Sequence, residues 1–411
     1  MIKFISWLSE KFGLDLKFLF KNSAWVTFNQ VVALITGLAI SVIFARFSDK
    51  NTYGQYSFLY SLLGIFTIFS IPGLSGVVFR ALARGFDGTY LPSVKHSLKM
   101  GLIAVPVFLT IGLLYWFSDA ALGYSLIVLS VVFPFVYPFQ LWTNLLQAKE
   151  KFKQLAVFNS IVLVINFIAI AIAIYIKPDN LFLIFTVSLL STCILNLFFY
   201  FRTKNLVSNS KVEEGWKNSA YLLLLPLMFT QFYDYIDKII LKFFMGNVVL
   251  AEYTIAVLPG DKLRFFLAAF LIMYLPKLYR ADTGHLIRFF RERFVFLLIF
   301  SFVFSFLLAL ILPYFIRFFY SSEFNSSILP AQIYLMILPF YFITVLTGNI
   351  LIKEKAEKYF TFSIVISSIA NLAAYFILIP LFGIMGGVAG SFVYFMVQAL
   401  MRLYYIFRNF S

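Results

Sequence analysis

Long apolar runs separated by short polar segments follow one another along the whole chain. The first, residues 24–45, is predominantly apolar and uncharged over 22 residues. A helix that crosses a bilayer needs about 20 such residues, whereas a barrel strand needs about 10 in an alternating pattern. Only helices satisfy their own backbone within lipid over runs of this kind. The pattern therefore predicts twelve transmembrane helices, at residues 24–45, 54–79, 98–117, 121–142, 154–176, 181–201, 219–243, 252–276, 294–316, 328–352, 359–380 and 385–407.

The two halves of the chain repeat each other. The tetrapeptide KNSA occurs at residues 21–24 and again at 217–220, an offset of 196. An offset of 205 aligns Asn166 with Asn371 further along. Six crossings give both copies the same orientation, so the pattern predicts a parallel internal repeat, as in many transporters. The expected fold is an all-α polytopic membrane protein made of two six-helix bundles, over residues 1–210 and 211–411.

The amino-acid composition agrees with a membrane protein, and the distribution of basic residues predicts how the chain is oriented in the membrane. The chain is 62% hydrophobic and 12% charged, whereas soluble domains are roughly a quarter charged. Of the 33 basic residues, 25 (Arg402 among them) are assigned to one set of alternate loops and the span ends next to them, 5 to the other set, and Lys238, Lys262 and Arg264 remain inside the membrane. Basic loops face the cytoplasm, so both termini are predicted to be cytoplasmic. The net charge of +15 then serves topology and lipid contact, and no nucleic-acid partner is expected.

The N-terminal segment predicts contact with the membrane surface, and the few cysteine and histidine residues argue against a metal site. Residues 1–21 alternate apolar and basic positions, which favours an interfacial amphipathic helix over a solvated tail. Charges scattered through this segment argue against a cleavable signal peptide. One cysteine, Cys193, and two histidines, His96 and His285, form no cluster. A zinc-type metal site is therefore not expected, and no cofactor is predicted apart from a possible coupling ion.

Several stretches resemble the polysaccharide (O-antigen) flippase family of the MOP superfamily, which also contains multidrug exporters of the MATE type. In the first half the stretch is FARFSDKNTYGQYSFLYSLLGIF, in which YGQY opens the second span. In the second half it is YIDKIILKFFMGNVVLAEYTIAVLPGDKLRFF. YLPKLYR and LIPLFGIMGGVAGS also follow habits of that family. Twelve spans fit the O-antigen type better than the fourteen of the lipid II flippases.

The resemblance implies a bacterial inner-membrane flippase and no enzymatic activity. Its substrate would be an undecaprenyl-diphosphate-linked oligosaccharide, moved to the periplasmic leaflet by alternating access for O-antigen or another surface polysaccharide. Partners implied with it are membrane lipids, a polysaccharide polymerase and a chain-length regulator. A cation-coupled multidrug exporter is the alternative within the superfamily. A glycan polymerase or ligase is disfavoured because the longest predicted outer loop, residues 317–327, has about 11 residues.

Six charged residues lie inside two predicted spans, where each costs about 2.5–3.5 kcal/mol on insertion scales. They are Asp234, Asp237, Lys238, Asp261, Lys262 and Arg264. One interpretation is structural: Asp234 would pair with Lys238 at i, i+4, Asp261 with Arg264 at i, i+3, and Asp237 with Lys262 across the spans. The other is functional: Lys262 and Arg264 would face a central cavity and bind the diphosphate.

Four more basic residues are predicted near the mouths of that cavity. Arg46 and Lys242, at the outer ends of the first and seventh spans, would take part in substrate release. Arg80 and Arg84, at the inner mouth, would attract the headgroup, although anchoring to lipid explains them equally well.

Ion coupling is assigned to carboxylates that only the second half carries. Asp237 has Tyr233 and Leu241 at i−4 and i+4, so it lacks a partner on its own helix and is the first candidate. Asp234 is the second. By the family resemblance, Asn371 would be a neutral co-ligand, although an interhelical hydrogen bond explains this residue as well. The coupling ion is left open between H⁺ and Na⁺.

Overall fold

The computed structural model describes residues 16–280 and 283–409, with side chains for residues 24–264, 267 and 291–409. Within these residues the chain is almost entirely helical. The predicted amphipathic segment 1–21 lies mostly outside the described residues. Helices of the first half are α2 (Leu16–Phe47), α3 (Lys50–Phe66), α4 (Gly73–Ala83), α5 (Tyr90–Gly101), α6 (Ala104–Trp116), α7 (Ala120–Gln140), α8 (Trp142–Ala148), α9 (Phe152–Ile176) and α10 (Leu181–Thr203). Those of the second half are α11 (Trp216–Leu222), α12 (Leu224–Arg280), α13 (Thr283–Phe319), α14 (Ile328–Leu335), α15 (Leu338–Lys353), α16 (Glu357–Phe382) and α17 (Ile384–Asn409).

Four short 3₁₀ segments connect some of these helices: η1 (Thr67–Ser70), η2 (Asp87–Thr89), η3 (Lys204–Leu206) and η4 (Ser322–Ser327). Each of the twelve predicted spans coincides with one helix or with consecutive helices, so the apolar pattern located them correctly. Several predicted single spans are nevertheless broken, for example at η1, where α3 and α4 are bent by 52°.

The number of crossings depends on how α12 is counted. Ten helices in the described part are long and apolar enough to cross a membrane, or eleven if the bent α3–α4 pair is one span. Helix α12 changes direction at Gly246, where φ is 82°. The Tyr253 hydroxyl lies 2.7 Å from the Asp237 carboxylate, although residues 16 apart in a straight helix are about 24 Å apart. Helix α12 is therefore a helical hairpin. With its two arms counted separately and the bent α3–α4 pair counted as one span, the described part has twelve candidate spans.

The helix ends at one end of the bundle are fixed by side-chain caps. Asp49 accepts a hydrogen bond from the Thr52 amide at the start of α3, and Asn180 accepts one from the Leu183 amide at the start of α10. Such caps satisfy amide groups that have no partner within the helix. They allow the short turns that the sequence predicted between consecutive spans.

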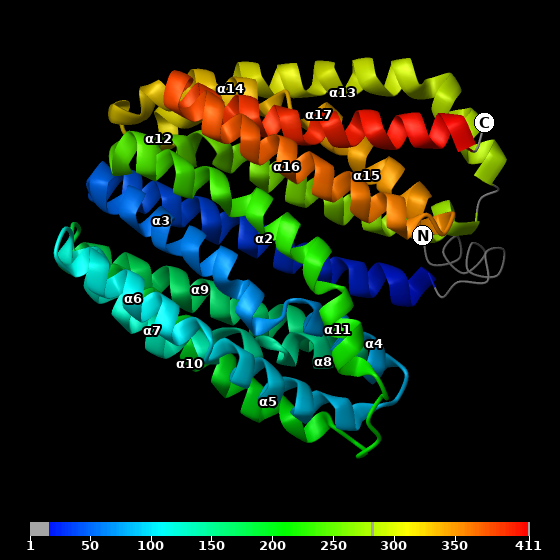
Figure 1. Ribbon diagram of the computed structural model, residues 1–411, viewed down its shortest axis with the longest axis horizontal. Coiled ribbons are helices and arrows are strands. Elements are labelled where there is room, and N and C mark those ends of the chain that lie inside the picture. The colour runs from blue at the N-terminus through cyan, green and yellow to red at the C-terminus, as the bar shows by residue number, and fades with distance from the viewer. Residues whose placement is uncertain (1–15, 281–282, 410–411) are drawn as a thin grey trace.

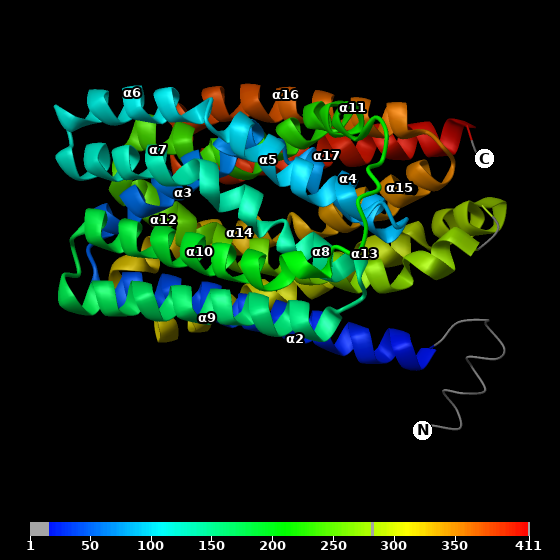
Figure 2. The same cartoon turned by 90° about the horizontal axis from the view of Figure 1, so that it is seen from below.

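Both halves use the same helix pairings. In the first half α2 packs on α9, α9 on α10, and α7 on α10; in the second, α12 packs on α16, α16 on α17, and α15 on α17. Helices α2, α3 and α12 lie between the two groups of helices (Figure 1). The start of α2 and the end of α17 lie at the same end of the molecule, as an even number of crossings requires (Figure 1 and Figure 2). The division at residues 210 and 211 stays a prediction.

The halves meet mainly along α3 and α12. Asn247 donates its side-chain amide to the Asn51 oxygen at 2.9 Å, and these two residues are separated by the 196-residue offset of the repeat. Lys50 forms an ion pair with Glu252 at 2.7 Å close by. The outermost helix, seen at the top of Figure 1, is α13, and many of its large apolar side chains from Val295 to Phe319 are exposed. In a bilayer these side chains meet lipid chains instead of water.

Candidate functional site

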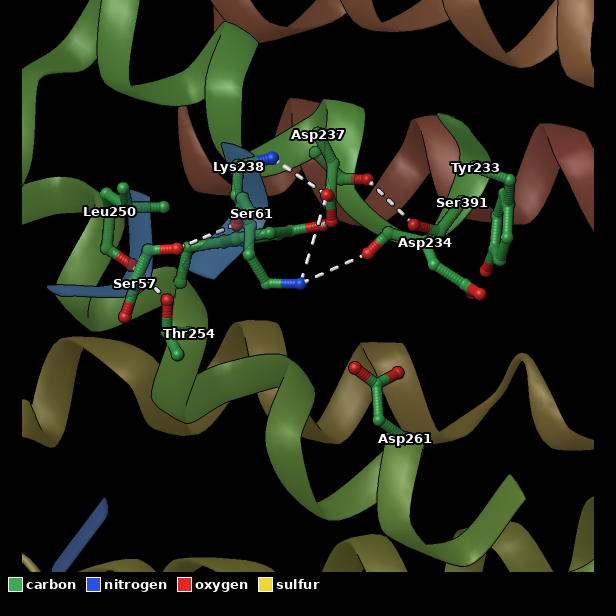
Figure 3. Close-up of polar contacts among 12 residues, drawn as sticks. Ser57, Ser61, Tyr233, Asp234, Asp237, Lys238, Leu250, Thr254, Asp261 and Ser391 are labelled. Carbon is green, nitrogen blue, oxygen red and sulfur yellow. Dashed lines mark hydrogen bonds and ion pairs between the residues drawn. The ribbon is translucent and has the colours of Figure 1, made fainter. Parts of the chain in front are cut away.

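The hairpin in α12 brings the charged residues of two predicted spans together. Asp234, Asp237 and Lys238 lie on its first arm, and Asp261 and Arg264 lie on the second. Figure 3 shows Asp261 directed toward the first arm. Gly246 makes this possible because its positive φ is readily adopted only by glycine. The sequence identified the residues, and the turn at Gly246 places them in one cluster.

Asp237 is the buried carboxylate of the cluster, with 7% of its surface exposed. Its Oδ2 accepts a hydrogen bond from the Tyr253 hydroxyl at 2.7 Å, and its Oδ1 lies 4.0 Å from the Lys238 Nζ. The predicted pair between Asp237 and Lys262 is not formed within the described residues. Asp237 is therefore held by a tyrosine from the opposite arm and by the lysine next to it in the chain.

Asp234 is the exposed carboxylate of the cluster. The predicted ion pair with Lys238 is absent, because the Lys238 Nζ donates to the Asp234 backbone carbonyl oxygen at 3.4 Å instead. The Asp234 carboxylate points away from Lys238 (Figure 3), and it makes no ion pair with any side chain that the structure describes. The premise that distinguished the two aspartates is thus reversed: Asp237 has a hydrogen bond and a nearby cation, whereas Asp234 forms no ion pair with a described side chain.

Arg264 forms the pair that was expected at i, i+3. Its Nη2 lies 2.5 Å from the Asp261 Oδ1, and the same oxygen accepts the Tyr334 hydroxyl at 2.5 Å. The Arg264 Nη1 donates to the Tyr233 hydroxyl at 2.8 Å, and the Phe395 ring centroid lies 5.3 Å from the guanidinium carbon. The Nε is buried without a hydrogen-bond partner in the described part. Most of the charge of Arg264 is therefore balanced by Asp261.

Lys262 is the cation of the cluster without an acidic partner in the described part of the chain. Its Nζ lies so close to α2 that a Cβ atom added at Gly37 would be 2.8 Å away. Gly37 also lines a cavity of about 180 Å³ together with Ser41, Tyr60 and Lys238. This cavity lies where α2 and α3 of the first half meet α12 of the second.

The two residues predicted at the outer mouth have local partners. Arg46 donates from Nε to the Phe319 carbonyl oxygen at 2.8 Å and from Nη2 to that of Phe318, so it satisfies the last carbonyl groups of α13. The Lys242 Nζ lies 3.7 Å from the centroid of the Phe58 ring and donates to the Tyr115 hydroxyl at 3.1 Å. Each of the two side chains contacts a helix of the other half of the chain. A role of either residue in substrate release stays a prediction.

Arg80 and Arg84, the two residues predicted at the inner mouth, share one acidic partner. The Arg84 Nη1 is 3.3 Å and the Arg80 Nε is 3.7 Å from Glu213 Oε1. Glu213 belongs to the segment that joins the two halves, and its backbone amide also donates to the Thr89 hydroxyl at 2.9 Å. Both arginines therefore help to attach this segment to the first half, and a role in headgroup capture stays a prediction.

Asn371 was interpreted either as a co-ligand of the coupling ion or as part of an interhelical hydrogen bond, and the structure shows the hydrogen bond. Its amide donates to the Gly390 carbonyl oxygen on α17 at 2.7 Å, and Asn166 likewise donates to Ser188 on α10 at 2.8 Å. The repeated Asn therefore joins equivalent helices in each half. No contact between Asn371 and Asp237 is found among the described residues, so the role of co-ligand stays a prediction.

Arg402 was missed as a buried charge. It is 4% exposed, donates to the Thr344 carbonyl oxygen at 2.6 Å and the Ser363 hydroxyl at 2.9 Å, and lies over the Phe360 ring. Sequence reasoning assigned it to a cytoplasmic segment, although it lies inside the predicted span 385–407. Its position in that span was the signal available. Its partners are neutral, so it fixes three helices together at the cost of burying a charge.

Comparison with known proteins places this arrangement in a family. A profile described as "Polysaccharide biosynthesis protein" matches residues 19–275, more than half of the chain. The chain belongs to the polysaccharide biosynthesis protein family. No match is found among curated proteins. The family resemblance that the motifs indicated is confirmed.

Solved structures similar to this family member are transporters and flippases of one fold. The lipid II flippase MurJ in an inward closed conformation is 14% identical, with a TM-score of 0.61 over 94% of this chain and 87% of that one. An inward-facing MATE family transporter of the MOP superfamily is 14% identical, with a TM-score of 0.69 over 92% and 95%. A MOP superfamily transporter from Pyrococcus furiosus is 14% identical, with a TM-score of 0.62 over 95% of each chain. The predicted MOP/MATE-like fold is thereby confirmed.

The described part of the chain offers no site for a resident metal ion. No three side chains among its His, Cys, Asp and Glu residues gather closely enough to hold one. The charged cluster on α12 contains three carboxylates, but they are separated by Lys238 and Arg264. That transport needs no resident cofactor stays a prediction.

Proposed function

We propose that this multi-pass membrane protein is a flippase for undecaprenyl-diphosphate-linked oligosaccharides. It would act in the bacterial inner membrane, with both termini cytoplasmic, and supply units for O-antigen or another surface polysaccharide. A polysaccharide polymerase and a chain-length regulator would act on its product. The family match and the fold, shared with transporters and flippases, support a lipid-linked substrate. The specific glycan and the orientation belong to the proposal.

One observation carries the substrate assignment: the ammonium group of Lys262 has no acidic partner among the described side chains and lies at the junction of the two halves. Its Nζ lies close to Gly37, which lines the same cavity as Lys238. A diphosphate is strongly anionic, and an ammonium with no carboxylate partner has its charge available to it. Arg264 is less available, because Asp261 already neutralises it at 2.5 Å. Lys262 is thus the first contact for the diphosphate and Arg264 the second.

The test measures flipping in proteoliposomes of an undecaprenyl-diphosphate-linked disaccharide with a fluorescent label. Lys262→Ala is expected to lower the rate about tenfold or more, since a hydrogen bond to a charged group contributes about 1.5–3 kcal/mol. Arg264→Lys should restore only part of the activity lost in Arg264→Ala, because an ammonium cannot form a bidentate contact. Arg317→Ala, at an exposed position on α13, is the control and should flip normally. Normal flipping by both alanine variants at normal abundance would refute the anion site.

A second candidate function is favoured by Asp234. An exposed carboxylate without an ion pair suits a cationic drug better than a diphosphate, and transporters named as multidrug resistance proteins share the fold. The same proteoliposomes distinguish the two functions. Gradient-driven accumulation of ethidium, with no flipping of the labelled lipid, would replace the flippase by a cation-coupled exporter.

The geometry also changes which carboxylate we expect to couple transport to an ion gradient. Asp237 was the first candidate, but Tyr253 and Lys238 hold it. A carboxylate with no partner gains or loses a cation with fewer contacts to rebuild, so it can bias two conformations more directly. We therefore expect Asp234→Asn to abolish the response of flipping to an imposed H⁺ or Na⁺ gradient. Asp237→Asn should keep that response and lower thermal stability.

The two variants serve as controls for each other because they lie on the same helix arm and make the same chemical change. If Asp237→Asn loses the gradient response and Asp234→Asn retains it, the original order of candidates is restored. If both respond as the unmodified protein does, neither carboxylate couples transport.

A further inference from the structure

The second span is interrupted next to a polar cavity that is separate from the charged cluster. Helix α3 ends at Phe66, η1 follows, and α4 begins at Gly73 after a bend of 52°. Ile71 at the break has φ of 55°, a left-handed conformation that is uncommon for a β-branched residue. Pro72 follows and lacks an amide hydrogen, so the helix cannot continue through this point. The break opens a space beside the span.

The space is a cavity of about 270 Å³ lined by the 3₁₀ segment η1 and by helices α4, α5, α7, α8 and α12. Of its lining residues, none is acidic or basic. All but one come from the first half; the exception is Gln231 on the first arm of α12. The polar lining residues are Thr67, Ser70, Ser75, Ser97, Tyr137, Gln140, Thr143, Asn144 and Gln231.

Some of these groups already have partners, and others do not. The Ser97 hydroxyl donates to the Ser70 carbonyl oxygen at 2.8 Å, and the Asn144 amide donates to the Ser75 hydroxyl at 2.9 Å. The Ser70 hydroxyl, in contrast, is on a residue only 5% exposed and has no hydrogen-bond partner in the described part of the chain. A buried hydroxyl without a partner costs about 1–3 kcal/mol, so its retention beside a cavity points to a bound polar molecule.

Three further groups line the cavity with hydrogen-bonding capacity to spare. The Gln231 and Gln140 amides and the Tyr137 hydroxyl make no hydrogen bond to another described residue. Together with Ser70 they offer donors and acceptors but no charge, and Tyr137 adds an aromatic ring. A drug-like apolar molecule would leave these groups unsatisfied, and a diphosphate would find no cation there. A sugar ring presents hydroxyl groups in several directions and an apolar face, so it matches both features.

We propose that this cavity binds a sugar residue of the lipid-linked glycan, an inference that rests on the proposed function. Position along α12 supports it. Gln231 precedes Asp234 by three residues, about 4.5 Å along the helix axis. A molecule whose diphosphate lies near the charged cluster therefore has its first sugars within reach of the cavity. Because Gln231 belongs to the opposite half, sugar binding also depends on how the halves are arranged.

The experiment compares the affinity of the purified protein for two kinds of lipid. The first is undecaprenyl diphosphate, and the second is the same lipid carrying one N-acetylhexosamine, one hexose or one deoxyhexose. We expect at least one sugar-bearing lipid to bind more tightly. Gln231→Leu, Tyr137→Phe and Ser70→Ala should each reduce that gain, Gln231→Leu by about tenfold, as expected for loss of one or two hydrogen bonds. Affinity for undecaprenyl diphosphate itself should not change.

Two of the variants should leave the fold intact, and the chain supplies a matched control. Tyr137→Phe keeps the ring, and Ser70→Ala removes a hydroxyl that has no partner, so its thermal stability should be unchanged or higher. The Ser160 hydroxyl on α9 is likewise buried without a partner but lies outside the cavity. Ser160→Ala should therefore bind every lipid as the unmodified protein does.

The outcomes separate the sugar site from the function it rests on. If undecaprenyl diphosphate binds but none of the three sugars adds affinity, the sugar site is refuted and the flippase proposal stands. If the cavity variants weaken both kinds of lipid equally, the cavity does not recognise sugar. If neither kind of lipid binds, the proposed function fails and the sugar site fails with it.

Discussion

Removing the Asp261 carboxylate is expected to destabilise the fold by leaving Arg264 without its counter-charge. Asp261 Oδ1 accepts two hydrogen bonds of 2.5 Å, one from Arg264 and one from Tyr334. In Asp261→Ala the guanidinium keeps only the Tyr233 hydroxyl at 2.8 Å as a described hydrogen-bond acceptor. The Arg264 side chain is 13% exposed and that of Asp261 is 31% exposed, so the arginine stays largely out of water after its partner is removed.

The size of the effect follows from this burial. Removing one partner of a buried ion pair costs about 3–5 kcal/mol. Because about a third of the Asp261 surface is accessible, water can reach the pair, and we expect the low end, about 3 kcal/mol. Removing both charges in Asp261→Ala/Arg264→Met leaves no unpaired charge and should cost about 1 kcal/mol or less. The double variant is thus expected to be more stable than Asp261→Ala.

The assay is a double-mutant cycle of unfolding free energies, measured by reversible unfolding in mixed detergent micelles. Tyr334→Phe serves as a control, because it removes one neutral donor to Asp261 and leaves the ion pair; it should cost about 1 kcal/mol. An interaction energy near zero, with the two single changes simply adding, would show that Asp261 does not neutralise Arg264. Arg264 would then be free to bind a diphosphate, and the ranking of Lys262 above it would be wrong.

Two further predictions concern the packing of the halves and the orientation of the chain. Gly54→Ala should destabilise the protein by about 1–3 kcal/mol, because the added Cβ would overlap the Asn247 backbone oxygen, which cannot move as a side chain can. Gly76→Ala is the control, because a Cβ at this position meets open space. Equal thermal stability of the two variants would contradict the close contact of α3 with α12. Thr283→Cys, made in a variant lacking Cys193, should not be labelled by an impermeant thiol reagent added to intact cells, since the distribution of basic residues predicts a cytoplasmic segment there. Ready labelling would show that the predicted orientation, and with it the direction of transport, is the reverse.

Much of the fold could be predicted from the sequence, because bilayer thickness sets the length of a span. Each apolar run of about 20 residues became a helix or consecutive helices at nearly the predicted position. The turn at Gly246 falls between the predicted spans 219–243 and 252–276, whereas the break at Pro72 interrupts the predicted span 54–79. A proline or glycine inside a membrane helix permits a bend, but neighbouring helices decide whether the bend occurs.

The partners of the charged side chains were decided by the tertiary structure. A sequence shows which residues share a helix face, and this was enough to predict the pair of Asp261 with Arg264 at i, i+3. The same rule paired Asp234 with Lys238 and left Asp237 alone, and both expectations were wrong. The reason is that Tyr253 reaches Asp237 from the other arm of the hairpin.

The partners of the basic residues Lys262 and Arg402 could likewise not be predicted from the sequence. Lys262 has no ion pair with a described side chain, and its Nζ lies beside Gly37 of α2, which has no side chain to offer it. Arg402 is buried where it donates to the Thr344 carbonyl oxygen and to the Ser363 hydroxyl, which belong to two other helices. Helix periodicity and the positive-inside distribution fix a residue's depth and face within its own span. Which group lies opposite that face depends on how the helices pack, and this is where the sequence stopped determining the site.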